Sequence, residues 1–263
     1  MQSSWAGVGA YWFRDNQIYL YGGFAELGER QEVIKASTSN ADDGEIFKFL
    51  DFVLSDSCNT RQPEKLPVLP ERIVVFRDGT GRGQFAEVQE QEFVQVSQAV
   101  AKNSRTTIPI TFVVCTKRIK QSMVSMSQEL ASRVKSSSKD ETVNIQPVSP
   151  SNIFNGPYGA VVNDARICRE PASEFYLFSL SSSPSTVRAV HYHIVQNQCG
   201  FSWSQVATYA FSLGHLYYNW PGPVLIPSPT QYGHAAAFLA SEVYSARKTT
   251  EQVLGFHRGL ICL

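Results

Sequence analysis

Two aromatic-rich runs near the start of the chain predict a β-hairpin. Gly7–Phe13 and Ile18–Phe24 are dense in Tyr, Trp, Phe and aliphatic residues, and the polar residues Arg14–Gln17 between them are typical of a turn. Gln31–Ala36 is a shorter run that predicts a third strand. This part of the sequence therefore favours a small antiparallel sheet.

Two later runs are apolar at nearly every position, which is typical of strands buried on both faces. They are Arg72–Phe76 (RIVVF) and Ile108–Cys115. A helical pattern precedes each of them. The first predicted helix starts at Asp42/Asp43 and ends near Ser57, and the second runs from about Gln84 to Asn103.

The second half of the chain continues this alternation. Phe175–Leu180 and Val187–Val195 predict two further strands, and Trp203–Tyr218 and Pro229–Arg247 predict two helices. Residues 120–151, which are rich in Ser, Lys and Gln, predict a loop insert. Strands followed by strands that alternate with helices predict a mixed α/β sheet covered by helices.

The last predicted helix follows a proline-rich extended stretch. Each proline fixes its own φ and keeps the preceding residue out of the helical region, so the chain is held extended up to Ser228. Ser228-Pro229 is typical of a helix start with a capping hydroxyl. His234 then lies in the second turn, opposite a stripe of residues that is predicted to face the core. The stripe comprises Tyr232, Ala235, Ala236, Leu239 and Val243.

Composition narrows the classes of protein that fit. At 263 residues and 43% hydrophobic, the chain can bury a sizeable core in one domain. No run of 18 apolar residues occurs, so no membrane-spanning helix is predicted. Five dispersed cysteines without a CxxC motif or metal-ligand spacing indicate reduced, intracellular thiols.

The net charge is 0, which argues mildly against nucleic-acid binding, but the charge is unevenly distributed. Residues 102–139 hold eight basic residues and one acidic residue, Glu129, which gives a net charge of +7. Such a block is typical of a phosphate-facing surface and also of a solvated loop. Composition alone leaves both interpretations open.

Asp78 closes the buried strand that contains RIVVF, and Gly79, Gly81 and Gly83 come next. A carboxylate at the end of a strand, beside a loop that permits close backbone approach, suits metal and phosphate chemistry. The alternative is an aspartate that begins a tight turn. The local pattern alone favours the turn.

Three blocks in order give the chain a resemblance to the PIWI domain of Argonaute/Piwi proteins, and to the Piwi branch in particular. They are Arg30–Ile34 (RQEVI), Pro70–Phe85 (PERIVVFRDGTGRGQF), and His215–Val224 (HLYYNWPGPV) with Gln231–His234 (QYGH). The resemblance implies a ribonuclease-H-like fold, a mixed β-sheet flanked by helices. We expect residues 1–263 to form a single PIWI domain with the loop insert at 120–151.

The resemblance also implies a chemistry, the Mg²⁺-dependent hydrolysis of RNA by a two-metal site. By matching position, Asp78 and His234 are metal-ligating and catalytic residues, and Glu32 is a catalytic residue that orders water around a metal. Arg82 replaces an acidic residue of the family pattern, which changes the local field but leaves the ligand in place.

The first catalytic aspartate of the family has no match in this sequence. In the family it lies on the strand before the Gly7–Phe13 strand, and Asp15 in the hairpin turn is too far along to replace it. We therefore expect a sheet that lacks its first central strand and a chain that does not cleave RNA alone. A fragment or truncated product fits this pattern better than a complete independent domain.

Further positions resemble the family's RNA-binding residues. Lys117 and Arg118 match a contact to the guide backbone, Lys120 extends that cluster, and Tyr232 and Leu263 match contacts near the guide. The expected partners are a guide small RNA and its target RNA, together with protein partners. The expected location is the cytoplasm, with perinuclear granules or the nucleus as alternatives. A second hypothesis is a non-catalytic protein-interaction module.

Two features need a separate interpretation. His191 and His193 lie two residues apart on a predicted strand, and therefore on one face, which is compatible with a metal site. The matching family segment is not a metal site, so a structural role is favoured. Glu92 falls within the apolar stripe of the second helix, where a carboxylate needs a cationic partner. We predict a structural ion pair there.

Overall fold

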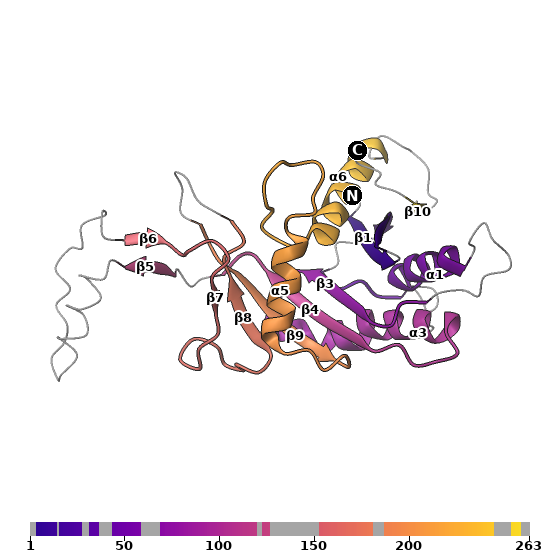
Figure 1. Cartoon of the computed structure of the whole chain (residues 1–263). Helices are drawn as coiled ribbons and strands as arrows, with labels where there is room; N and C mark the ends of the chain where they lie inside the picture. The colour runs from indigo at the N-terminus through magenta and orange to yellow at the C-terminus, as the bar shows by residue number, and fades with distance from the viewer. Residues whose placement is uncertain are drawn as a thin grey trace.

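The computed structural model describes residues 4–14, 16–27, 32–36, 44–58, 69–119, 123–126, 153–180, 187–244 and 254–258. The strands in this part of the chain form a three-stranded sheet, a five-stranded sheet and a two-stranded sheet. Figure 1 shows helices on both sides of the two larger sheets, as expected for an α/β architecture.

The three-stranded sheet contains the predicted hairpin. Strands β1 (Ser4–Arg14) and β2 (Gln17–Leu27) pair antiparallel along their whole length. The third strand is β10 (Leu254–Arg258), which pairs with β2 and was not predicted. The prediction of a strand at Gln31–Ala36 is wrong for the described residues 32–36. They are irregular because side chains, and no neighbouring strand, bind the backbone of Ile34.

The five-stranded sheet is mixed. Strand β3 (Ile73–Asp78) lies parallel to β4 (Ile110–Thr116), and β9 (Val190–Asn197) is antiparallel to β4 on its other side. Strands β8 (Glu174–Leu177) and β7 (Val161–Val162) complete the sheet. Every residue of β4 except its last is buried, which explains the continuous apolar run in the sequence.

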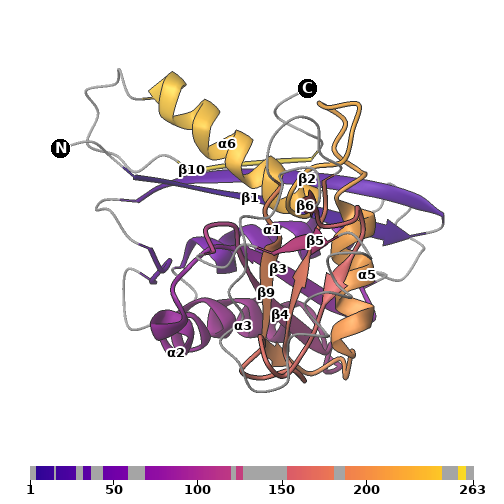
Figure 2. The same cartoon turned by 90° about the vertical axis from the view of Figure 1, so that its left-hand side faces the viewer.

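Helices cover both larger sheets. Figure 2 shows the hairpin sheet between α6 (Ser228–Tyr244) and α1 (Glu45–Cys58). The second predicted helix is a continuous helical stretch with a π-helical turn, comprising Arg82–Gln84, α2 (Phe85–Val88), Gln89–Phe93 and α3 (Val94–Asn103). It packs against one face of the mixed sheet, and α5 (Trp203–Leu213) packs against the other.

Helix α6 approaches β1 through two glycines. A Cβ atom on Gly233 would lie 2.6 Å from the Gly7 carbonyl oxygen, and one on Gly7 would overlap the Gly233 carbonyl. This close contact turns the buried face of the helix away from the predicted stripe. Tyr232, Ala236 and Ala240 are buried, whereas Leu239 and Val243, predicted to face the core, are 39% and 55% exposed.

The start of α6 also differs from the prediction. The Ser228 hydroxyl does not cap the helix but donates to the Leu213 carbonyl at the end of α5, at 2.5 Å. The amides of Thr230 and Gln231 donate to the Pro227 carbonyl. The hydroxyl therefore fixes α6 to α5.

Strand β5 (Val124–Met126) lies inside the predicted loop insert and pairs with β6 (Ile153–Asn155). The insert is thus not wholly irregular, because residues 123–126 contain this short strand. Within the described ranges β1 pairs only with β2, β3 pairs only with β4, and no strand joins the two larger sheets. In the same ranges no helix is long and apolar enough to cross a membrane.

Candidate metal and nucleic-acid site

Asp78, Lys117 and His234 meet at the carboxyl end of β3 and β4. Asp78 is the last residue of β3 and pairs in register with Cys115, and Lys117 follows β4 directly. His234 reaches the same place from α6. Its Nε2 lies 2.6 Å from Asp78 Oδ2, and the Lys117 ammonium lies 3.1 Å from the same oxygen. The structure therefore brings together the aspartate and histidine singled out in the sequence.

The charge of Asp78 is stabilised by its two partners. Burial by itself would raise the pKa of the Asp78 carboxyl, but His234 and Lys117 outweigh burial and lower it to about 2. Asp78 is therefore ionised at neutral pH. The pKa of the neighbouring Cys115 thiol is raised, mainly by burial and secondly by the charge of Asp78. The thiol therefore stays protonated.

The other oxygen of Asp78, Oδ1, is suited to act as a metal ligand. Oδ1 is buried and has no hydrogen-bond partner, and a carboxylate oxygen is the ligand that Mg²⁺ prefers. Asp78 and His234 therefore fit one cation. Lys117 already supplies a positive charge beside Oδ2. Among the described residues, Asp78 and His234 are not part of a cluster of three His, Cys, Asp or Glu ligands.

Glu32 is connected to this site by a hydrogen bond of its backbone. Its carbonyl oxygen accepts a hydrogen bond from the guanidinium of Arg77, the residue before Asp78. Its side chain is exposed, and the structure shows no contact between the Glu32 carboxylate and Asp78 or His234. The catalytic role of Glu32 stays a prediction.

Arg77 and Glu92 form the connection that places residues 32–36. The guanidinium of Arg77 donates to both carboxylate oxygens of Glu92, each at 3.1 Å, and also to the carbonyls of Asp78 and Gly79. Glu92 in turn accepts from the Ile34 amide at 2.9 Å. The predicted structural ion pair is confirmed. Glu92 lies in the π-helical turn, 1% exposed, where the pattern alone could not reveal its partner.

The glycine loop after Asp78 is attached to the mixed sheet by Arg82. Its guanidinium lies 2.9 Å from Glu174 Oε2 on β8 and 2.8 Å from His193 Nε2 on β9. Sequence reasoning missed Glu174. The signal available was an isolated glutamate at the start of an apolar strand, which becomes informative only once the register pairs it with His193.

The residues expected to contact RNA are placed differently from one another. Arg118 is exposed beside Lys117. Tyr232 is 3% exposed, and its hydroxyl accepts a hydrogen bond from the Tyr218 amide at 2.9 Å. A phosphate contact by Tyr232 stays a prediction. Lys120 and Leu263 lie outside the described residues.

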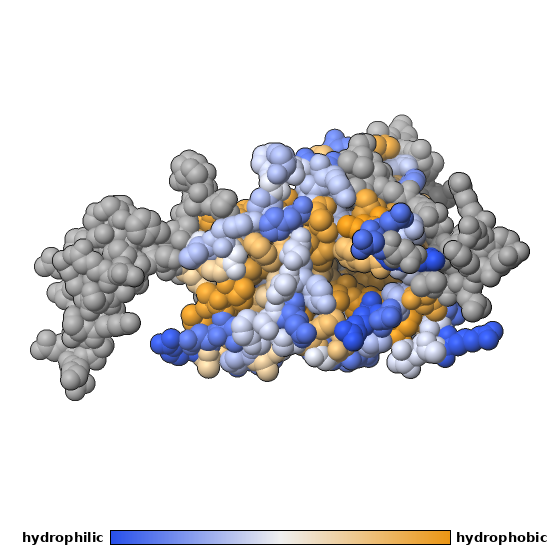
Figure 3. Space-filling model, viewed as in Figure 1, coloured by the Kyte–Doolittle hydropathy of each residue, from blue (hydrophilic) through white to orange (hydrophobic). Residues whose placement is uncertain are grey.

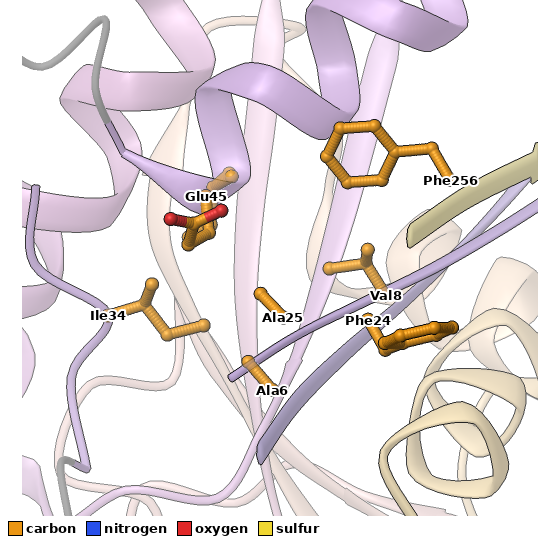
Figure 4. A pocket seen from close by; sticks show the side chains of 8 residues that line it. Ala6, Val8, Phe24, Ala25, Ile34, Glu45 and Phe256 are labelled. Carbon is orange, nitrogen blue, oxygen red and sulfur yellow. The ribbon is translucent and has the colours of Figure 1, made fainter. Parts of the chain in front are cut away.

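A small cavity lies between the hairpin sheet and α1, and is distinct from this site. Figure 4 shows the Glu45 carboxylate among apolar side chains of β1, β2 and β10. The cavity has a volume of about 10 Å³, which is enough for one water molecule at most. It is therefore a packing defect.

The face of the molecule that Figure 3 shows has hydrophobic residues at the surface on either side of α5, with hydrophilic residues around them.

Comparison with known proteins decides the family. A family model of the Piwi domain matches residues 16–245. The chain belongs to the Piwi domain family. This Piwi domain is similar to Piwi-like protein Ago3 of Bombyx mori, 31% identical over 182 residues, and to Piwi-like protein 1 of Danio rerio, 30% identical over 175 residues. The matches cover 68% and 66% of this chain but 17% and 18% of those proteins.

The fold of this Piwi domain is also found among solved structures. The crystal structure of the C-terminal lobe of a budding yeast Argonaute matches 95% of this chain, and half of that one, with a TM-score of 0.63 and 15% identity. At this identity the likeness concerns the fold alone. The expected ribonuclease-H-like α/β fold, a mixed sheet flanked by helices, is confirmed.

Proposed function

We propose that this chain binds RNA as part of a Piwi-type protein in small-RNA-guided silencing, with a guide and a target RNA as partners. The observation that supports it is the pair Lys117 and Arg118 at the carboxyl end of β4, beside Asp78. Ligands of open α/β sheets bind at the carboxyl ends of the strands. Two cations there suit a phosphate backbone, which gives affinity without sequence preference.

Lys117 has a specific part in this proposal. Its side chain is one third exposed, and its ammonium neutralises Asp78 at 3.1 Å from Oδ2. A phosphate that approaches the site competes with Asp78 for this ammonium, whereas Arg118 is exposed and needs no rearrangement. Arg118 therefore contributes more to RNA affinity than Lys117 does.

Filter binding of single-stranded RNA at several salt concentrations tests RNA binding. We expect weak binding with little sequence preference, and a slope of log affinity against log salt that falls by about 0.7 in Arg118→Ala, the value for one phosphate contact on a single strand. Arg166→Ala is the matched control, because Arg166 is 89% exposed and pairs with Asp164 outside the site. A folded protein without salt-dependent affinity would favour the alternative, a protein-interaction module.

We infer that the site of this chain alone does not cleave RNA. Two Mg²⁺ ions, when bound, activate water and stabilise the leaving oxygen. Asp78 and His234 supply ligands for one, while Lys117 screens Asp78. A labelled RNA incubated with the chain and Mg²⁺ should stay intact. Mg²⁺-dependent product that disappears in Asp78→Asn, but not in the control Glu90→Gln, would contradict this inference.

A further inference from the structure

A second cluster of ionisable side chains lies on β8 and β9, distinct from Asp78. Glu174 is 2% exposed, and its Oε2 lies 3.0 Å from His191 Nε2 and 3.1 Å from His193 Nδ1. The register brings these residues together, because Glu174 pairs with His193 and His191 lies two residues away on the same face. One ligand atom from each of the three lies within 4.8 Å of the others.

We propose that Glu174, His191 and His193 bind a zinc-class divalent metal ion, and that Arg82 closes the site when the metal is absent. Two imidazole nitrogens and a carboxylate oxygen are ligands of this class, and a fourth position is open to water. In a tetrahedral zinc site the ligand atoms lie roughly 3.3 Å apart. The distances of 3.0 and 3.1 Å from Glu174 Oε2 are close to that spacing.

An unpartnered nitrogen supports the same conclusion. His193 is 5% exposed, and its Nδ1 is buried without a hydrogen-bond partner although Glu174 Oε2 lies at ion-pair distance. An unsatisfied buried polar atom is costly. Coordination would satisfy it. Burial also lowers the pKa of both histidines below the ordinary value, so the rings are neutral near pH 7 and can bind metal.

Arg82 and the metal exclude each other for a chemical reason. A guanidinium only donates, so Arg82 at 2.8 Å makes His193 Nε2 the acceptor, and the neutral ring then carries its proton on Nδ1. A metal on Nδ1 requires the proton on Nε2, which can no longer accept from Arg82. A metal on Nε2 takes the place of the guanidinium directly. Metal binding therefore releases Arg82, and with it an anchor of the glycine loop that follows Asp78.

Titration of the tag-free, chelator-treated chain with Co²⁺, followed by visible absorption and by Zn²⁺ displacement, tests the proposal. We expect one ion per chain without thiolate charge-transfer bands, which excludes the cysteines. Glu174→Gln and His193→Asn should weaken binding by about a hundredfold or more. Arg82→Gln should tighten it by about tenfold, because it removes the competing charged hydrogen bond. His215→Asn is the matched control and should bind like the wild type, because His215 is exposed after α5 and its ring contacts the Phe211 carbonyl, outside both sites.

Three results of this titration would overturn the proposal. Absence of Co²⁺ binding by the folded wild type would do so, as would binding that His234→Asn, a variant of the Asp78 site, abolishes and Glu174→Gln retains. If Glu174→Gln fails to fold, Arg82→Gln decides, because tighter binding cannot come from misfolding, and unchanged or weaker binding rejects the site. RNA binding enters none of these readouts, so this inference stands or falls independently of the proposed function.

Discussion

At the scale of single residues, the site depends on how two carboxylates are neutralised, the half-buried Asp78 and the buried Glu92. Asp78 shares one oxygen between an imidazole and an ammonium, and leaves the other without a partner. Glu92 uses both oxygens on one guanidinium. The first arrangement leaves Oδ1 without a partner, whereas the second uses both carboxylate oxygens. Of these two carboxylates, only Asp78 is therefore suited to bind an external ligand.

The lowered pKa of Asp78 makes stability depend on pH. The pKa of this carboxyl is about 2 in the folded chain, whereas its ordinary value is 3.8. The stability that the ionised carboxylate contributes to the fold is therefore fully present above pH 3.8 and is lost as the pH falls towards 2. We expect Asp78→Asn to lower the unfolding free energy by about 2 kcal/mol at pH 7. Urea unfolding at pH 7, 4 and 3 measures whether this difference shrinks as the pH falls. A difference that is constant with pH would contradict the ion pair.

Removal of one partner from the Arg77–Glu92 pair should be more costly. Glu92→Gln leaves a nearly buried guanidinium without its counter-charge, so we expect the unfolding free energy to fall by about 3 kcal/mol. Glu90→Gln in the same π-helical turn is the control, because Glu90 is exposed. Urea titration of both variants tests this. Equal stability of the two would show that the pair contributes little.

At the scale of elements, His234 is placed by the contact between α6 and β1. The glycines Gly7 and Gly233 let the backbones approach, and Gly233 is the residue before His234. The hydroxyl of Thr230 donates to the Phe76 carbonyl at 3.1 Å, which ties the same helix to β3. The histidine therefore reaches Asp78 only if α6 keeps this depth against the hairpin.

Gly7→Ala tests this placement. The added methyl group overlaps the Gly233 carbonyl, so the helix must shift, and we expect a loss of about 2 kcal/mol in unfolding free energy. A substitution at Gly81, where an added Cβ meets nothing within 4 Å, is the matched control. Urea unfolding measures both variants, and NMR of the His234 ring reports the shift of the helix. A Gly7→Ala variant as stable as Gly81→Ala would reject the close contact.

Sequence patterns predicted where helices and strands lie better than which of their faces are buried. The runs at Arg72–Phe76 and Ile108–Cys115 became β3 and β4, but only β4 is buried along nearly its whole length, whereas the residues of β3, at the edge of the sheet, are half-buried. The exposed face of α6 was misjudged, since periodicity does not reveal a glycine contact across the helix axis. Strand β10 was missed because five residues carry too weak a pattern. Asp78 and His234 could be predicted because they lie in sequence blocks that match the family in order. The contacts of Lys117, Glu174 and Arg82 could not be predicted, because they depend on the register between strands.

At the scale of the whole molecule, two sheets meet through helices. The hairpin sheet and the mixed sheet share no strand in the described ranges, and α6 contacts both. One hydrophobic cluster extends from Tyr21 and Phe49 to Phe112 and joins the hairpin sheet, α1, α3 and β4. The candidate site at Asp78 lies where α6 and the mixed sheet come together. Its geometry therefore depends on both halves of the fold.

The sharing of Lys117 has a consequence for how binding and protons are coupled. If a phosphate takes the Lys117 ammonium from Asp78, the carboxylate loses one of the two partners that hold its pKa at about 2, and its affinity for a proton increases. Below about pH 4, RNA binding would then draw a proton from solution. The heat of binding would depend on the ionisation enthalpy of the buffer, and this calorimetric signature would vanish in Asp78→Asn.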